Sequence, residues 1–162
     1  MHDQLYLLAE ELGRLLKSRG KTIAVAESCT GGMVAKTITD IPGSSEWFEC
    51  GFVTYSNASK VQMLGVKQKT LDNYGAVSFE TAREMLTGVF NQTEVDVAVA
   101  VTGIAGPGGG LKNKQVGTIF IGIGVAGEIS FIDKRNFKGD RLSIRQQTVK
   151  FVMEKVLKKL SA

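Results

Sequence analysis

The chain has 162 residues, of which 43% are hydrophobic and 22% charged, which predicts one globular domain over residues 1–162 rather than two. Its net charge of +4 is mild, and no run of Lys or Arg is long enough for a nucleic-acid-binding arm. The cysteines Cys29 and Cys50 form neither a disulfide framework nor a zinc spacing, and because His2 is the only histidine, a His-based triad or metal site is excluded.

The first half of the chain predicts alternating helices and strands. Leucines at helical spacing indicate an amphipathic helix over residues 3–18, which Asp3 can cap and Gly20 can end. No basic segment followed by an apolar stretch precedes it, and no window approaches the length of a membrane span, so we expect a cytoplasmic protein without membrane contact. The pattern then predicts a buried strand at 22–26, a helix at 33–39, a turn at 41–45, a strand at 48–55 and a short helix at 57–64.

The second half predicts one more helix, three strands and a terminal helix. Ser78 can cap a helix whose first turn holds Glu80. A buried strand at 95–101, a glycine-rich loop at 102–115, a hairpin at 116–125 and 128–137, and a helix from Asp140 to Leu160 follow. Because strands alternate with helices first and a hairpin comes late, we expect an α/β sandwich with a mixed sheet covered by helices.

Residues 26–32, Ala-Glu-Ser-Cys-Thr-Gly-Gly, lie where a predicted strand passes into a helix. Ser28 would sit near backbone N–H groups that can stabilise an oxyanion or hold a phosphate. By itself the segment favours the alternative that Ser28 belongs to a Ser/Thr-capped helix. Cys29 is the rival nucleophile, but it has no histidine partner, and we expect it to be buried and inert.

Tyr55, Asn57 and Lys60 follow the strand predicted at 48–55 and can face one cavity. A lysine acts as a general base if burial or a neighbouring cation lowers its pKa from about 10.4. The local pattern alone favours a solvated helix lysine.

The segment from Thr102 to Gly110 reads Thr-Gly-Ile-Ala-Gly-Pro-Gly-Gly-Gly and follows a buried strand, where α/β proteins place ligand sites. It has neither the Gly-Lys-Ser/Thr ending of a P-loop nor a following helix. A loop whose amides approach an anionic or planar ligand and a flexible connection remain equal alternatives. Arg141 opposes the helix dipole in a first turn, which indicates a phosphate or carboxylate ligand, although a solvated Arg141 after an Asp140 cap is the simpler interpretation.

Together these segments resemble the CinA C-terminal-domain family of nicotinamide-mononucleotide amidohydrolases. The matching stretches occur in the family's order over nearly the whole chain, which makes them more specific than any one glycine motif. They are AESCTGG at 26–32, PGSSEWFECGFVTYSNASK at 42–60, GAVS at 75–78, TGIAGPGGG at 102–110, VGT at 116–118 and GDR at 139–141.

The resemblance implies hydrolysis of nicotinamide mononucleotide to nicotinic acid mononucleotide and ammonia, in pyridine-nucleotide recycling. It implies Ser28 as nucleophile, Lys60 as its base and Tyr55 in an assisting role. It also implies a homo-oligomer, a small-molecule nucleotide substrate, no nucleic-acid partner, and no metal or cofactor. The substrate-binding positions it indicates are Thr30, Gly31, Gly32, Asn57, Thr102, Gly103, Gly106 and Arg141.

Two points qualify the match. Gln115 stands where family members often have a proline, a change confined to a loop. Longer CinA proteins carry an additional N-terminal domain, for which a chain of 162 residues has no room, so we expect the stand-alone form here. The alternatives are a nucleotide-binding module without catalysis and a competence-associated regulatory role, and the modest charge without an aromatic-basic patch disfavours DNA binding.

Overall fold

The computed structural model describes residues 1–162 and is built on a five-stranded mixed sheet. The strand order is β2-β1-β3-β4-β5, in which β1 runs parallel to β2 and β3, and β4 and β5 form an antiparallel hairpin. This confirms the predicted mixed sheet. The strands are β1 (Ile23–Glu27), β2 (Phe48–Val53), β3 (Val97–Gly103), β4 (Thr118–Val125) and β5 (Glu128–Asn136).

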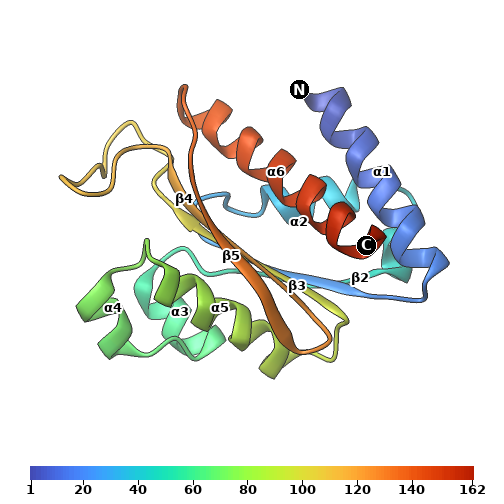
Figure 1. Cartoon of the computed structure of the whole chain (residues 1–162), viewed down its shortest axis with the longest axis horizontal. Helices are drawn as coiled ribbons and strands as arrows, with labels where there is room; N and C mark the ends of the chain where they lie inside the picture. The colour runs from blue at the N-terminus through green and yellow to red at the C-terminus, as the bar shows by residue number, and fades with distance from the viewer.

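Helices cover both faces of the sheet, which makes a three-layer α/β sandwich (Figure 1). One face carries α1 (His2–Ser18), α2 (Met33–Thr39) and α6 (Arg141–Ser161). The other carries α3 (Asn57–Leu64), α4 (Gln68–Tyr74) and α5 (Phe79–Gln92). A single 3-10 turn, η1 (Ser44–Glu46), lies in the turn predicted before β2.

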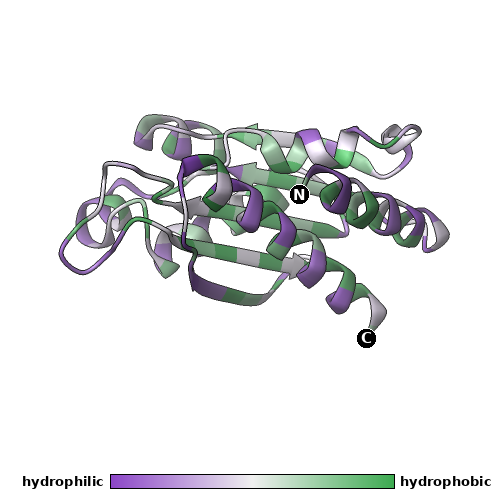
Figure 2. Cartoon of the chain, turned by 90° about the horizontal axis from the view of Figure 1, so that it is seen from above, coloured by the Kyte–Doolittle hydropathy of each residue, from purple (hydrophilic) through white to green (hydrophobic).

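The two faces of the sheet bury side chains of different size. In β1 and β3 the valines belong to a cluster of 25 buried residues shared with α1, α2 and α6. The alternating alanines belong to a cluster of 11 residues shared with α3, α4 and α5. Successive side chains of a strand point to opposite faces, so one face of β1 and β3 carries only alanines. Because these side chains are small, α5 can lie close against that face. The central strands are accordingly apolar almost throughout (Figure 2).

Most predicted helix boundaries agree with the structure, but one cap is wrong and one helix was not predicted. Ser78 and Asp140 cap α5 and α6 by accepting from the N–H groups of Thr81 and Ser143. The predicted Asp3 cap is wrong, because the N-cap of α1 is Met1, two residues earlier, and Asp3 lies inside the first turn. Helix α4 was not predicted, because only two of its seven residues are buried and its apolar periodicity is therefore weak.

The parallel register brings the carboxyl ends of β1, β2 and β3 to one edge of the sheet. Glu27 lies between Val53 and Val101 on the neighbouring strands. The backbone continues this pairing past the strand ends, since the Ser28 N–H donates to the Val101 carbonyl at 2.9 Å and the Thr54 N–H to the Glu27 carbonyl at 2.9 Å. The three segments that the sequence singled out for chemistry therefore begin side by side.

None of the helices combines the length and apolar character that a membrane span requires.

Replacing Gly88 with alanine should destabilise the protein. Gly88 lies in α5 where the end of α3 crosses it, and a Cβ atom there would lie 2.1 Å from the Leu64 carbonyl oxygen. We expect a loss of about 1–3 kcal/mol, as for other overpacked sites, in spite of the better helix propensity of alanine.

Urea denaturation of Gly88→Ala beside Thr87→Ala, an exposed position of the same helix, measures this effect. Thr87→Ala should stay within about 0.5 kcal/mol of the natural protein. A Gly88→Ala protein as stable as this control would contradict the close α3–α5 contact.

Candidate active site

Ser28 lies directly after β1 and is 8% exposed. It does not cap the following helix, because the N-cap residue of α2 is Gly32, which has no side chain that could accept a hydrogen bond. The first N–H groups of α2 are instead bound by Glu27, whose buried carboxylate accepts from Val34 at 2.8 Å and Ala35 at 3.0 Å. This fastens the start of α2 to the end of β1 and holds the intervening turn in place. The capped-helix alternative for Ser28 is therefore wrong.

Lys60 lies in the second turn of α3 and points inward, with only 1% of its surface exposed. The solvated-lysine alternative is therefore wrong. Its Nζ atom lies 2.9 Å from Ser28 Oγ, 2.8 Å from the Thr54 carbonyl oxygen and 3.2 Å from the Tyr55 carbonyl oxygen. Burial lowers the pKa of Lys60 from 10.5 to about 8, because the charged ammonium loses its hydration.

The three contacts of Lys60 suit both of its protonation states. An ammonium has three N–H donors for the three oxygens. A neutral amine donates to the two carbonyl oxygens and accepts the Ser28 O–H proton with its lone pair. A proton can therefore pass between Ser28 and Lys60 without any side chain changing its place, which is the requirement for a base that activates a nucleophile.

Ser28 and Lys60 open onto a cavity of about 270 Å³ at the carboxyl edge of the parallel strands. Its only charged lining residues are Lys60 and Arg141, and no carboxylate lines it. The full lining is Ser28, Cys29, Tyr55, Lys60, Ala76, Val77, Thr102, Gly103, Ile104, Ala105, Gly108, Gly109 and Arg141.

Arg141 and Tyr55 meet at the mouth of this cavity. The Arg141 guanidinium donates to the Tyr55 hydroxyl at 2.9 Å and to the Gly106 carbonyl oxygen at 2.8 Å. These contacts join α6, the β2–α3 connection and the glycine-rich loop. The simpler interpretation of Arg141 as a merely solvated side chain is therefore wrong, although its surface remains exposed.

The remaining predicted residues are divided between the cavity and its support. Thr102 and Gly103 line the cavity, and the Thr102 hydroxyl donates to the Ala76 carbonyl oxygen at 2.8 Å. Five others do not line it: Thr30, Gly31, Gly32, Asn57 and Gly106.

Two supporting residues escaped the sequence analysis. Glu27 is one, and Arg145 is the other, whose guanidinium donates to the Thr30 carbonyl oxygen at 2.9 Å. Arg145 lies one helical turn after Arg141, so the i, i+4 spacing on α6 was the signal that could have found it. Ala76 and Val77, which also line the cavity, belong to the GAVS stretch of the family resemblance, but the sequence analysis gave them no role.

Cys29 agrees with the expectation of a buried, inert thiol. It is 6% exposed, and burial raises its pKa from 9.0 to about 12. At neutral pH the side chain is therefore a thiol rather than the thiolate that attacks carbonyl carbons.

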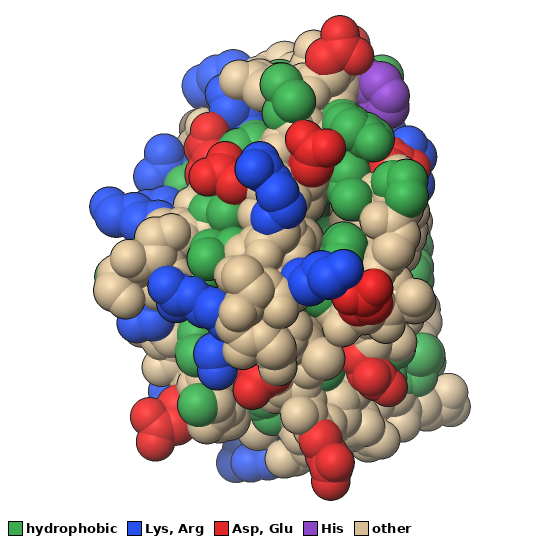
Figure 3. Space-filling view, turned by 90° about the vertical axis from the view of Figure 1, so that its right-hand side faces the viewer, with side chains coloured by type: hydrophobic (Ala, Val, Ile, Leu, Met, Phe, Trp, Pro, Cys, Tyr) green, Lys and Arg blue, Asp and Glu red, His purple; other side chains and the backbone are tan.

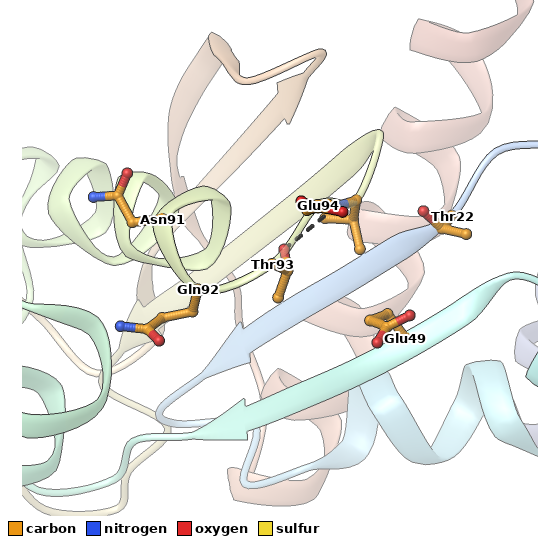
Figure 4. A pocket seen from close by; sticks show the side chains of 7 residues that line it. Thr22, Glu49, Asn91, Gln92, Thr93 and Glu94 are labelled. Carbon is orange, nitrogen blue, oxygen red and sulfur yellow. Dashed lines mark hydrogen bonds between the residues drawn. The ribbon is translucent and has the colours of Figure 1, made fainter.

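A larger hollow of about 460 Å³ lies at the opposite edge of the sheet, where the parallel strands begin (Figure 4). It contains amide, hydroxyl and carboxylate groups but no nucleophile paired with a base, and the Thr93 hydroxyl donates to the Val89 carbonyl oxygen at 2.8 Å. The chemistry-bearing residues therefore gather at the Ser28 cavity. The hollow is lined by Thr22, Glu49, Asn91, Gln92, Thr93, Glu94 and Val95.

Known proteins resemble the chain over nearly its whole length. A family model described as the CinA C-terminal domain matches residues 6–160. The nicotinamide-nucleotide amidohydrolase PncC of Enterobacter agglomerans is 48% identical over 155 residues, which cover 96% of this chain and 94% of that protein. PncC of Escherichia coli strain K12 is 47% identical over 152 residues, or 94% and 92% of the two chains.

Solved structures share the same fold. A CinA superfamily protein from Klebsiella pneumoniae 700603 matches with a TM-score of 0.93 at 32% identity, covering 97% of this chain and 98% of the other. The competence/damage inducible protein CihA from Agrobacterium tumefaciens matches with a TM-score of 0.93 at 38% identity, covering 98% and 96%.

Replacing Lys60 with methionine should change how stability depends on pH. Because the pKa is lowered on folding, the unfolded chain binds more protons than the folded one between pH 8 and 10.5, and stability rises with pH in that window. Relative to Lys60→Met, the unfolding free energy of the natural protein should increase by roughly 3 kcal/mol across it, at about 1.4 kcal/mol per pKa unit.

Denaturant titrations of both proteins at several pH values across this window measure the difference. Groups that titrate in both proteins cancel when the two are subtracted. A difference that does not change with pH would mean that Lys60 keeps its ordinary pKa.

Proposed function

The chain belongs to the CinA C-terminal-domain family, and from that premise we propose that it hydrolyses the carboxamide of nicotinamide mononucleotide, releasing nicotinic acid mononucleotide and ammonia. The observation that carries the proposal is the buried contact of 2.9 Å between Lys60 Nζ and Ser28 Oγ at the floor of the cavity. A lysine buried against a serine hydroxyl is costly for a binding module and useful for a hydrolase.

In the first step Lys60 in its neutral form accepts the Ser28 hydroxyl proton while Oγ attacks the carboxamide carbon. The negative charge that forms on the carbonyl oxygen needs hydrogen-bond donors. The backbone N–H groups of Cys29 and Thr30 suit this role, because they follow the nucleophile directly and donate to no backbone oxygen of the protein.

The tetrahedral intermediate collapses when Lys60 returns its proton to the amide nitrogen and ammonia leaves. The remaining ester joins Ser28 Oγ to the nicotinoyl carbon. Water then attacks this ester, with Lys60 again taking the proton, and Ser28 Oγ departs with a proton from Lys60. Over the cycle one water is consumed, and the amide becomes a carboxylic acid and ammonia.

The substrate itself favours the neutral form of Lys60. Its pyridinium ring carries a positive charge, and a cation beside an ammonium lowers the pKa of that ammonium further. This effect adds to the burial that already brings the pKa to about 8.

Charge on one face of the molecule and at the cavity does not favour a nucleic-acid role. On the right-hand side of the molecule in Figure 1, which Figure 3 turns toward the viewer, Lys and Arg side chains are intermixed with Asp and Glu (Figure 3). Arg141, which the cavity does contain, is engaged with Tyr55 and Gly106 instead of standing in a row of cations.

Ser28→Ala should remove ammonia release, while Cys29→Ala should retain most of it. Loss of a serine nucleophile that acts with its base costs at least about 10³-fold in kcat in comparable hydrolases. Initial rates of ammonia release from nicotinamide mononucleotide, measured for both variants, separate the two nucleophiles. Full activity in Ser28→Ala, or its loss only in Cys29→Ala, would refute the assignment.

The pH dependence should follow Lys60. Because the neutral amine is the active form, kcat/KM should rise about tenfold per pH unit below the pKa of about 8 and become constant above it. Lys60→Arg should lose about 10²–10⁴-fold, because guanidinium does not deprotonate in this range. Rates measured between about pH 6.5 and 9.5 test this, and an acid-side limb that persists in Lys60→Arg would assign the titration to another group.

A further inference from the structure

Arg145 of α6 holds the turn that follows Ser28. Its guanidinium donates to the Thr30 carbonyl oxygen at 2.9 Å, a contact between residues 115 positions apart in the chain. The same carbonyl oxygen accepts from the Met33 N–H at 3.0 Å, and the Thr30 side chain is completely buried. The nucleophile turn is therefore bound from two sides, by the start of α2 and by a cation on α6.

The Arg145 side chain is packed closely against this turn without satisfying all of its donors. A Cβ atom on Gly31 would contact a terminal nitrogen of the guanidinium at 3.4 Å, and Gly31 has a φ angle of +57°, which favours glycine. The Arg145 Nε atom is buried and has no hydrogen-bond partner. Because burying a polar group without a partner costs free energy, the stability of the fold does not explain why a cation stands here.

Two opposite charges act on Cys29, the residue directly after the nucleophile. Burial is the main cause that raises the pKa of the Cys29 thiol to about 12. The Glu27 carboxylate raises this pKa further, whereas the Arg145 guanidinium and, less strongly, Lys60 lower it. An oxyanion bound by the N–H group of Cys29 would form in the same place. The Glu27 charge would therefore disfavour the oxyanion, and the Arg145 charge would favour it.

We propose that Arg145 is a positioning residue for the hydrolysis, which holds the N–H groups of Cys29 and Thr30 in place for the oxyanion and offsets the negative charge of Glu27 beside them. The inference rests on the proposed function, because the oxyanion forms on the carboxamide of the substrate. Arg145 does not line the cavity, so it acts through the turn and not by touching the substrate. Glu27 fastens the turn to α2, and Arg145 fastens it to α6 while compensating the charge that Glu27 brings.

The test compares three replacements of Arg145 with a matched control on the same helix. Arg145→Met removes the charge and the donors, Arg145→Gln keeps a neutral amide donor, and Arg145→Lys keeps the charge. The control is Lys150→Met, since Lys150 is a cation of α6 that pairs with Glu154 at 3.8 Å and does not line the cavity. Initial rates of ammonia release from nicotinamide mononucleotide give kcat and KM for each protein. Thermal unfolding shows which variants are folded, and if Arg145→Met is not, the comparison of Lys with Gln still decides.

We expect Arg145→Met to lower kcat about 10- to 100-fold with KM nearly unchanged, somewhat less than the loss of an oxyanion donor itself. Arg145→Lys should retain more of kcat than Arg145→Gln, because the charge acts on the oxyanion and a neutral donor does not. Lys150→Met should change neither constant. An unchanged kcat in Arg145→Met, a loss confined to KM, or an Arg145→Gln protein at least as active as Arg145→Lys would overturn the inference.

A fluorophosphonate probe separates this inference from the proposed function. Ser28 Oγ attacks the phosphorus and displaces fluoride while Lys60 takes the hydroxyl proton, so labelling requires no carboxamide substrate. Negative charge grows on the phosphoryl oxygen as on the oxyanion, and Arg145→Met should slow the labelling of Ser28, followed by mass spectrometry, about tenfold or more.

The two readouts together distinguish the possible failures. If Arg145→Met slows the labelling of Ser28 but the natural protein releases no ammonia from nicotinamide mononucleotide, the amidohydrolase proposal fails and the role of Arg145 stands. If ammonia is released and Arg145→Met keeps the natural kcat, the role of Arg145 fails alone. Absence of both labelling and ammonia release would refute both.

Discussion

The burial of the Lys60 amine against the Ser28 hydroxyl is the interaction on which the rest of the site depends. An ammonium removed from water is unstable unless oxygens replace its hydration, and here the Thr54 and Tyr55 carbonyls and the Ser28 hydroxyl do so. The replacement is incomplete, which is why the pKa of Lys60 falls to about 8. The lost hydration destabilises the folded protein, but it also leaves part of the Lys60 side chains neutral near neutral pH, and a neutral amine can accept a proton. Such a compromise between stability and function is common.

Several parts of the fold serve to hold this pair together. The parallel pairing of β1 with β2 sets Glu27 beside Val53, so that Ser28 and Thr54 leave the sheet as neighbours. The Glu27 carboxylate then binds the first N–H groups of α2, which fixes the turn that contains Ser28. On the far side, α3 is held against α5 so closely that only glycine fits at position 88. A shift in any of these contacts would change the distance between Ser28 and Lys60.

The remainder of the cavity extends from the Ser28–Lys60 pair to Arg141. Tyr55 contacts Lys60 through its carbonyl oxygen and Arg141 through its hydroxyl, and so connects the floor of the cavity with its mouth. The relatives of similar length share this whole chain, whereas the CinA-like protein of Endomicrobium trichonymphae, at 50% identity, is matched over only 36% of its length. A region similar to this chain therefore occurs both in relatives of similar length and as part of a longer protein.

The sequence by itself determined the helices with strong apolar periodicity, the buried strands, the caps at Ser78 and Asp140 and the mixed sheet, because these follow from local patterns and chain order. Motifs spread along the chain, through the family resemblance, also singled out Ser28 and Lys60 as the candidate pair, whose side chains lie 2.9 Å apart in the structure. It failed where local signals are weak, as in α4, or absent, as for Glu27 and Arg145. Only the tertiary structure decided that Lys60 is buried instead of solvated. Burial lowers its pKa, and that burial arises only when α3 folds against the sheet edge and brings Lys60 to Ser28, 32 residues away in the chain.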